Sequence, residues 1–447
     1  MRISEDQARE LAARAVALTK ADEAEAVVTA NDAALTRFAN NRIHQNVAEE
    51  DTTVSVRAVL GKRTGVASTN RLDDASLKAC CGSAVAAARV APEDAEYPGL
   101  PKPAQAERID RVCASTQAFD AEARAKAAAA IIEQSRFRGL SAAGAVARVD
   151  YAVAVANSHG VDVAMGVTDV KATVLSAGTD GGSGWASWLG CDAAHFAPEA
   201  LGDEAAMLAQ RSDNPGSLEP GVYAVVLAPE AVSDVLDFLG YLGFGAQAVA
   251  EKASFIAGHE GELLLSELIT LTENALSAET VGLTFDFEGS PKRRTPLVEA
   301  GIVRGPVTDS YWAAKLGVPN TGHALPAPNP YGPLPMNLEL AAGETSVDEM
   351  IASVERGLYV TRFHYVNVED PVRVTLTGMT RDGTFLIENG RLTQPVKNIR
   401  FTQSAVDALS DVRAVGDRRV LVGPEEGGAN LTPALLLGSW NVTGQTR

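Results

Sequence analysis

The chain has 447 residues, of which 46% are hydrophobic and 21% charged, as is usual for a soluble globular protein of two to three domains. Acidic residues outnumber basic ones by 57 to 39, and the resulting net charge of −18 argues against a general nucleic-acid-binding surface, which needs clustered lysine and arginine. No run reaches the roughly 18 apolar residues that a membrane-spanning helix requires, and the acidic N-terminus is unlike a signal peptide. Four cysteines form no disulfide framework, so we expect a cytoplasmic protein.

The N-terminal part predicts helices that alternate with groups of short strands. A helix is expected from Ser4, which can cap it, to Lys20. Strand-like runs rich in β-branched residues follow between residues 26 and 60, and an alanine-rich helix is expected over 73–90. Residues 91–107 are rich in proline and charge and are the best candidate for an internal linker.

A second stretch of the same kind follows the linker. It predicts a helix over 120–134, strands over 143–176, a glycine-rich break at 181–184 and a helix over 198–211. Both stretches run strand, strand, helix, which suggests an internal duplication within an α+β layer. The alternative is that similar turn sequences recur without a common origin.

The pattern of predicted helices and strands changes near residue 215, where Asp213–Ser217 predicts a turn. We therefore divide the chain into an N-terminal α+β domain, 1–215, and a C-terminal domain, 216–447. The second begins with an apolar strand over 222–227 and a helix over Glu230–Phe255. Strands dominate afterwards and predict mainly antiparallel β structure, with helices only near 346–357 and 401–409.

The usual spacings of catalytic metal ligands and nucleophiles are missing from the sequence. A catalytic zinc needs three protein ligands and an open position, but no two of the six histidines lie closer than 36 residues and the helix over Glu230–Phe255 contains none. His259 precedes Glu260 without a second histidine in reach, which predicts a loop residue. The segment around Ser183 lacks the second glycine of a serine-hydrolase elbow, and no phosphate-binding loop occurs.

Two later blocks carry the candidate site. In an extended strand, Phe285 and Phe287 would face one way and Asp286 and Glu288 the other, before Gly289 turns the chain into a basic run. The carboxylates would either pair with nearby arginines or line a peptide groove or a subunit interface. The second block, 320–324, holds a glycine that permits close approach of another chain. Its histidine is expected to be a hydrogen-bonding loop residue rather than a ligand. The candidate groove or interface residues are Asp286, Glu288, Gly289, Arg293, Arg294, Thr321, Gly322 and His323.

The order of these blocks resembles the TldD/PmbA family, also called TldD/TldE, whose members are described as modulators of DNA gyrase and as metallopeptidases. The resemblance is carried by similarity to the family patterns Phe-Asp-x-Glu-Gly at 285–289, Leu-x-Glu-x-Gly at 297–301 and Tyr-x-Ala-x-x-Leu-Gly at 311–317. The family's Ser-Thr-Gly-Asn is altered here, because Asn320 replaces the serine and His323 the asparagine.

The resemblance also defines what this chain lacks. Peptidases of the family carry His-Glu-x-x-x-His on the helix that corresponds to Glu230–Phe255 and take a further zinc ligand from a late cysteine, whereas the last cysteine here is Cys191. The resemblance therefore implies a PmbA/TldE-like, non-catalytic subunit without zinc of its own. It would form a heterodimer with a zinc-bearing TldD-like paralogue, or a homodimer, and act on peptides or unfolded proteins. The alternatives are a metallopeptidase with scattered ligands and a peptide-binding, chaperone-like homodimer.

Overall fold

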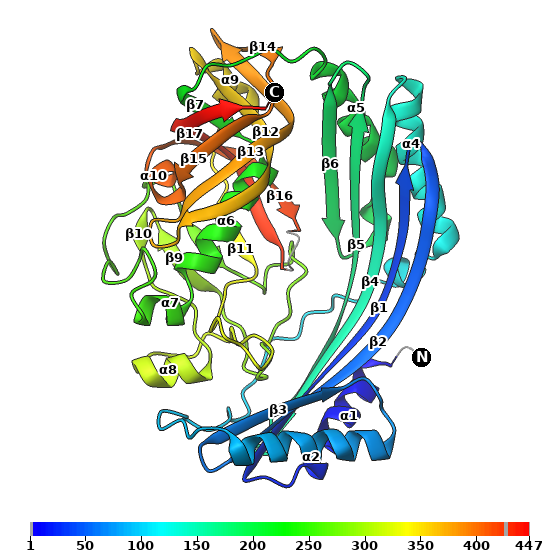
Figure 1. Ribbon diagram of the computed structural model, residues 1–447, viewed down its shortest axis with the longest axis vertical. Coiled ribbons are helices and arrows are strands. Elements are labelled where there is room, and N and C mark those ends of the chain that lie inside the picture. The colour runs from blue at the N-terminus through cyan, green and yellow to red at the C-terminus, as the bar shows by residue number, and fades with distance from the viewer. Residues whose placement is uncertain (1–2, 424–427, 447) are drawn as a thin grey trace.

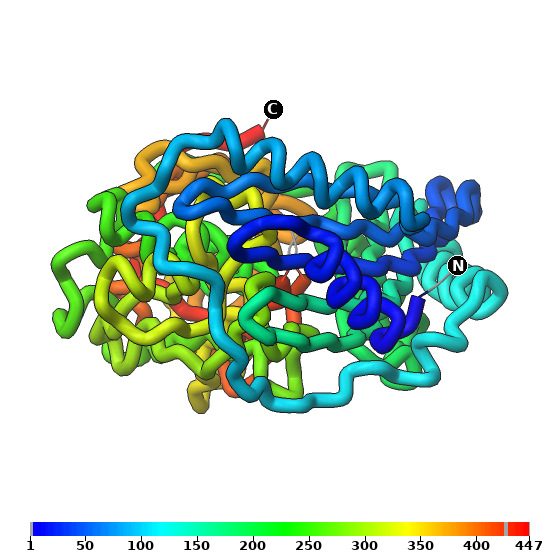
Figure 2. The backbone as a smooth tube through the Cα atoms, turned by 90° about the horizontal axis from the view of Figure 1, so that it is seen from below, coloured from blue at the N-terminus to red at the C-terminus, as the bar shows by residue number. Residues whose placement is uncertain are grey.

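The computed structural model describes residues 3–423 and 428–446, which form two sheets with helices around them (Figure 1). The prediction of an α+β fold with a mainly antiparallel C-terminal part is confirmed. Residues 91–107 contain neither helix nor strand. Figure 2 shows the chain between α2 and α4 crossing one side of the molecule. Within the described residues, no helix combines the length and apolar character needed to cross a membrane.

The first sheet has six antiparallel strands in the order β3-β2-β1-β4-β5-β6. Its strands are β1 (Glu23–Ala39), β2 (Arg42–Leu60), β3 (Arg63–Thr69), β4 (Ser141–Asn157), β5 (Asp162–Ala177) and β6 (Ser183–Gly190). The accompanying helices are α1 (Glu5–Leu18), α2 (Asp74–Val90), α3 (Ala114–Gln117), α4 (Ala121–Phe137) and α5 (Pro198–Arg211), with a 3-10 turn at Ala193–His195.

Each half of this sheet runs helix, three strands, helix, and the two halves meet at the central pair β1–β4. The predicted repeat is thus present in the topology, with three strands in each unit. A matching detail is the glycine at the start of each third strand. A Cβ atom on Gly65 would lie 2.2 Å from the Ala88 nitrogen of α2, and one on Gly184 would lie 2.2 Å from the Ala205 oxygen of α5. Glycine is required at both places because a helix backbone packs directly on the strand.

Both faces of the first sheet are covered, which explains the continuous apolar run in β1. Ala26 and Val28 pack with α1 and α2 on one face, whereas Val27 points to the other face. There, Val27 joins valines of β4 and β5 and Phe285 of the C-terminal part in a separate apolar cluster. The two halves of the chain therefore share a core at this junction.

The second sheet has eleven strands and is mostly antiparallel, with parallel pairs β7–β12 and β11–β17. Its strands are β7 (Gly221–Leu227), β8 (Leu271–Glu273), β9 (Thr295–Glu299), β10 (Ile302–Val303), β11 (Leu338–Leu340), β12 (Arg356–Asp370), β13 (Thr375–Glu388), β14 (Arg391–Pro395), β15 (Ile399–Ser404), β16 (Val412–Val422) and β17 (Asn430–Gln445). Its helices are α6 (Pro229–Gly243), α7 (Ala246–Ala250), α8 (Ser310–Leu316), α9 (Val347–Ala352) and α10 (Ala405–Ser410).

Several predicted elements differ from the structure. Helices were expected after residue 255 only near 346–357 and 401–409, but α8 is a further one, and the helix near 346–357 ends at Ala352. The helix expected over Glu230–Phe255 ends at Gly243 and is followed by the short α7. The Phe255 ring packs against Gly243, where a Cβ atom would lie 2.2 Å from it. The helix expected over 401–409 begins only after Ser404, whose side chain caps it, and the residues before it form β15. The strand expected at 285–288 is a turn. The division of the chain near residue 215 stays a prediction.

Candidate functional site

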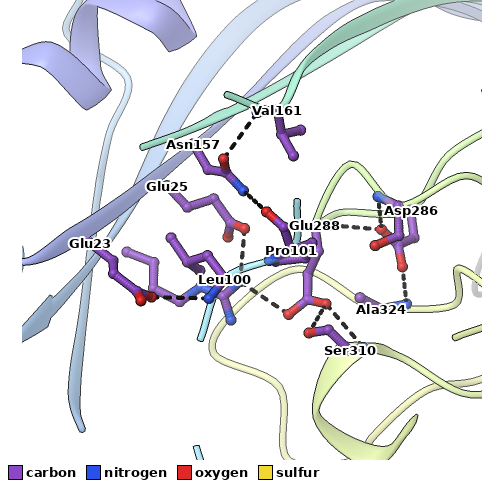
Figure 3. Close-up of polar contacts among 12 residues, drawn as sticks. Glu23, Glu25, Leu100, Pro101, Asn157, Val161, Asp286, Glu288, Ser310 and Ala324 are labelled. Carbon is purple, nitrogen blue, oxygen red and sulfur yellow. Dashed lines mark hydrogen bonds and ion pairs between the residues drawn. The ribbon is translucent and has the colours of Figure 1, made fainter. Parts of the chain in front are cut away.

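Asp286 organises the turn at 285–290 and faces inward rather than toward a groove. Its Oδ1 accepts hydrogen bonds from the backbone N–H groups of Glu288 (3.0 Å) and Ser290 (2.9 Å), and its Oδ2 accepts one from Ala324 (2.9 Å) (Figure 3). These bonds close a turn, so the expected alternation of a strand is wrong. Burial and the neighbouring Glu288 carboxylate raise the pKa of Asp286, while the three N–H groups oppose that rise.

Glu288 joins the turn to the first sheet through a buried ion triad. Arg57 of β2 donates from Nη2 to Glu25 of β1 at 2.8 Å and to Glu288 at 3.1 Å (Figure 3). Burial, only partly offset by Arg57, raises the pKa of Glu25 to about 6. Burial alone would lower the pKa of Arg57, but the two carboxylates raise it above its ordinary value. Glu288 does pair with an arginine, but this arginine comes from the other half of the chain rather than from the basic run after Gly289.

The second oxygen of Glu288 holds the start of α8. It accepts hydrogen bonds from the Ser310 N–H (3.2 Å) and from the Ser310 hydroxyl. Asp309 caps the same helix by accepting from the Trp312 N–H at 2.8 Å. One carboxylate therefore connects β2, the turn and α8, which fixes the position of the turn between the two sheets.

Gly289 makes the closest approach of this turn to the first sheet. Its φ is +74°, and a Cβ atom would lie 2.4 Å from Cγ1 of Val161. We expect Gly289→Ala to lower the free energy of unfolding by about 2–4 kcal/mol, through strain and displaced packing. The control is Gly317→Ala, which has a similar φ of +68° but no atom within 4 Å of the added methyl group. Equal losses in urea denaturation of the two variants would contradict a packing role for Gly289.

The two arginines after the turn are not members of the ion triad. Arg293 and Arg294 are exposed, and the Arg294 guanidinium lies 3.4 Å from the Thr272 hydroxyl of β8. Arg294 lines a polar groove of about 420 Å³. The other residues of its wall are Thr270, Thr272, Glu279, Glu339, Ala341, Ala342, Asp417 and Arg419. Of the eight candidate residues, Arg294 thus lies in a groove, whereas Asp286, Glu288 and Gly289 hold the two halves together.

Thr321, Gly322 and His323 belong to a second buried polar cluster. The Thr321 hydroxyl lies 2.9 Å from Nδ1 of His323, and Nε2 of His323 lies 3.3 Å from Oε1 of Glu273. Nζ of Lys292 is 3.6 Å from the same oxygen. Gly322 has a φ of +76°, and a Cβ atom there would lie 2.4 Å from the carbonyl oxygen of Pro291, so only glycine fits.

This second cluster is structural rather than hydrolytic. Although burial by itself would raise the pKa of Glu273, Lys292 and His323 hold it at about 2. Burial and the Lys292 charge lower the pKa of His323, which is 1% exposed. The order threonine, histidine, glutamate is that of a relay, but the Thr321 hydroxyl also bonds the Thr308 carbonyl at 3.1 Å and the histidine is sealed from solvent. The prediction of a hydrogen-bonding loop histidine agrees with this geometry.

One face of α6 carries acidic residues that the sequence analysis did not predict as a site. The pattern that could have indicated it is the spacing of the carboxylates, four and three residues apart. Glu230, Asp234 and Asp237 are all half-buried on one side of the helix. Asp234 accepts from the Phe363 N–H at 3.2 Å, and Asp237 accepts from the Asn430 amide. Burial is the largest cause that raises their pKa values, to about 7 for Glu230 and Asp237 and about 8 for Asp234. Near neutral pH these carboxyl groups are therefore partly protonated, Asp234 the most.

Three family models match the chain in order. They are described as PmbA/TldA metallopeptidase domain 1, central domain and C-terminal domain, and they match residues 24–88, 101–212 and 220–444. The chain belongs to the PmbA/TldD family. Among curated members, it is 29% identical over 174 residues to the metalloprotease TldD homolog of Haemophilus influenzae, which covers 38% of this chain and 36% of that protein. It is 27% identical over 224 residues to the metalloprotease PmbA of Escherichia coli O157:H7, which covers 49% and 46%.

Solved structures of PmbA/TldD type share the whole fold. The TldE protein of Thermococcus kodakarensis and a Thermotoga maritima protein described as a modulator of a DNA gyrase each have a TM-score of 0.87 at 18% identity, over 97% of this chain and 99% of theirs. At that identity the likeness establishes the fold alone. The two curated relatives are matched over less than half of their own lengths.

The residues on α6 do not fit the zinc of the family's peptidases. A catalytic zinc site needs three protein ligands that converge on one position. The carboxylates of α6 are engaged elsewhere, because Asp234 accepts the Phe363 N–H and Asp237 accepts the Asn430 amide. In residues 3–423 and 428–446, no three histidine, cysteine, aspartate or glutamate side chains come together in a way that could hold a metal ion. We derive no reaction step through a metal from this arrangement.

Proposed function

We propose that this chain is a PmbA/TldE-like, non-catalytic subunit that shapes a peptide-binding cavity for a zinc-bearing TldD-like partner. The observation that carries the proposal is α6. The helix that bears His-Glu-x-x-x-His in the family's peptidases is present and well packed, yet it carries three carboxylates and no histidine. A scaffold kept without its ligands supports a role in assembly and substrate positioning rather than in bond cleavage.

The chemistry of α6 suits contact with a peptide. A protonated carboxyl group donates one hydrogen bond and retains acceptor capacity. Glu230 and Asp234, with pKa values of about 7 and about 8, can therefore meet both carbonyl and N–H groups near neutral pH. A row of ionised carboxylates would be acceptor-only and costly to desolvate. The groove beside Arg294 supplies further polar side chains for an extended chain.

The ion triad supports the same role because it fixes the two sheets relative to each other. A subunit that frames a cavity must hold its walls at a fixed separation. Arg57 and Glu288 connect positions 231 residues apart, and Gly289 packs on valines of the first sheet. The junction therefore stabilises one arrangement of the two sheets, against which a partner and a peptide can bind.

The test combines metal analysis with activity. The chain is purified alone and with a TldD-type relative that retains His-Glu-x-x-x-His, and zinc content and cleavage of an unstructured protein are measured for each. We expect substoichiometric zinc and no cleavage for the chain alone, stable co-purification with the relative, and faster or more selective cleavage by the pair. Stoichiometric zinc in the isolated chain, together with cleavage abolished by a chelator, would overturn the proposal.

A control separates assembly from hidden chemistry. The double variant Glu230→Gln/Asp234→Asn keeps size and hydrogen-bonding capacity but removes both carboxylates. If the chain acts only by positioning, the complex of this variant should still form and still cleave. Loss of cleavage with normal assembly would assign a catalytic role to α6 instead.

A further inference from the structure

A pocket lies at the junction, between the first sheet and the C-terminal loops. Its volume is about 220 Å³. The floor comes from neighbouring positions of β1, β2 and β3, with Tyr151 of β4 beside them, and the roof comes from Phe287 and the loop at 326–327. The residues of its wall are Glu25, Val27, Thr29, Ser55, Val56, Arg57, Val66, Tyr151, Phe287, Pro326 and Ala327.

The charged residues of the pocket neutralise one another. Arg57 is held between Glu25 and Glu288, and its Nε is buried without a hydrogen-bond partner. Two carboxylates already face this single guanidinium, both through Nη2. A third carboxylate would add to the excess of negative charge in a poorly solvated place. The pocket therefore selects against charged groups.

The remaining wall is mainly apolar, with the hydroxyl groups of Thr29, Ser55 and Tyr151 as its polar members. Val27, Val66, Phe287 and Pro326 present hydrocarbon to the pocket. A cavity of about 150 Å³ lined by apolar side chains binds benzene, so a volume of about 220 Å³ accommodates one aromatic ring. Tyr151 adds a hydroxyl that makes no hydrogen bond to any residue the structure describes, and burial raises its pKa to about 12. This hydroxyl stays protonated and can pair with one polar group of a ligand.

We propose that this pocket binds one uncharged aromatic side chain of a peptide, and so gives the chain a preference for substrates with phenylalanine or tyrosine. The inference rests on the proposed function for its choice of a peptide as ligand. The pocket is formed by this chain alone, so its binding can be measured without the partner. A negative result in the zinc and assembly experiment would therefore not contradict the pocket assignment. A negative result in the peptide titration would likewise not contradict the proposed subunit role.

The test is calorimetric titration of the full chain with three capped tripeptides: Ala-Phe-Ala, Ala-Ala-Ala and Ala-Glu-Ala. We expect the phenylalanine peptide to bind about tenfold or more tightly than the alanine peptide, since a buried ring removes much more apolar area from water than a methyl group. The glutamate peptide should bind no better than the alanine peptide. Equal affinity for all three peptides, or a preference for the glutamate peptide, would overturn the proposal.

Filling the pocket provides the matched variants. Val66→Phe places a ring in the space, and Thr29→Leu, a smaller addition on β1, serves if the first variant does not fold. Both should abolish the preference for phenylalanine. Val222→Phe is the control, because Val222 is 68% exposed and lies outside the pocket. Retention of the preference in a folded pocket-filling variant would place the binding site elsewhere and reject the assignment.

Discussion

Replacing Arg57 by methionine is expected to lower the free energy of unfolding by about 3–5 kcal/mol, the usual cost of removing one member of a buried ion group. Glu25 is 2% exposed and Glu288 8% exposed, so neither carboxylate can recover the lost interaction by turning to water. The variant keeps most of the side-chain volume, and the loss therefore reports charge rather than a cavity. Urea denaturation followed by circular dichroism measures it.

Two further variants test whether the loss of stability in Arg57→Met is specific to the buried ion triad. Arg9→Met removes an ion pair of similar geometry, with Nε 2.6 Å from Asp162, but both side chains are about half exposed and the loss should be about 0–1 kcal/mol. The triple variant Arg57→Met/Glu25→Gln/Glu288→Gln should recover much of the stability that Arg57→Met loses, because no buried charge remains uncompensated. Similar losses for Arg9→Met and Arg57→Met would show that the junction is solvated and that the triad does not hold it.

The Arg57 variant should also be more sensitive to pH than the parent. Burial already raises the pKa of Glu25 in the folded state, and without the opposing guanidinium this pKa rises further above its unfolded value. A raised carboxyl pKa contributes stability that is complete below the unfolded pKa and is lost as pH rises through the folded value. The loss in free energy of unfolding caused by Arg57→Met should therefore be smaller at about pH 5 than at about pH 8.

Elements whose determinants are local could be predicted from the sequence. The first helix was expected from a serine cap and an apolar stripe, and Ser4 does cap it by accepting from the Gln7 N–H. The turn at 285–290 could not be predicted in the same way. Its form depends on the Ala324 N–H, 38 residues away, and a pattern of alternating polar and apolar residues fits both a strand and this turn. The need for glycine at position 243 of α6 likewise depends on a ring from outside the helix, that of Phe255.

In the candidate site, too, local features could be predicted from the sequence and long-range contacts could not. Sequence reasoning selected Glu288, Gly289 and Gly322, and all three occupy constrained positions, but the reasons differ from those expected. Glu288 was assigned to a polar strand face, whereas its ion partner lies 231 residues away on β2. Only long-range packing brings such pairs together, and no local pattern signals it. The carboxylates of α6 are the opposite case, since their spacing of four and three residues is a helical pattern that the sequence itself contains.

The carboxylates of α6 are expected to make the protein less stable as pH rises, and Asp234→Asn should remove part of that effect. Burial and Asp237 raise the pKa of Asp234 to about 8, against opposition from the Phe363 N–H and Arg362. Because the folded pKa exceeds the unfolded one, the contribution of the protonated group is complete below about pH 4 and is lost as pH rises toward about 8.

Asparagine mimics the protonated carboxyl group and cannot ionise. The free energy of unfolding of Asp234→Asn should therefore exceed that of the parent by more as pH rises. We expect the variant to be about 1–3 kcal/mol more stable than the parent at about pH 8.5, and within about 0.5 kcal/mol of it at about pH 4.5. The matched control is Glu10→Gln on the exposed side of α1, which should shift stability little at either pH. If Asp234→Asn instead destabilises the protein more at high pH than at low pH, then Asp234 is ionised in the folded state and the proton-holding face of α6 does not exist.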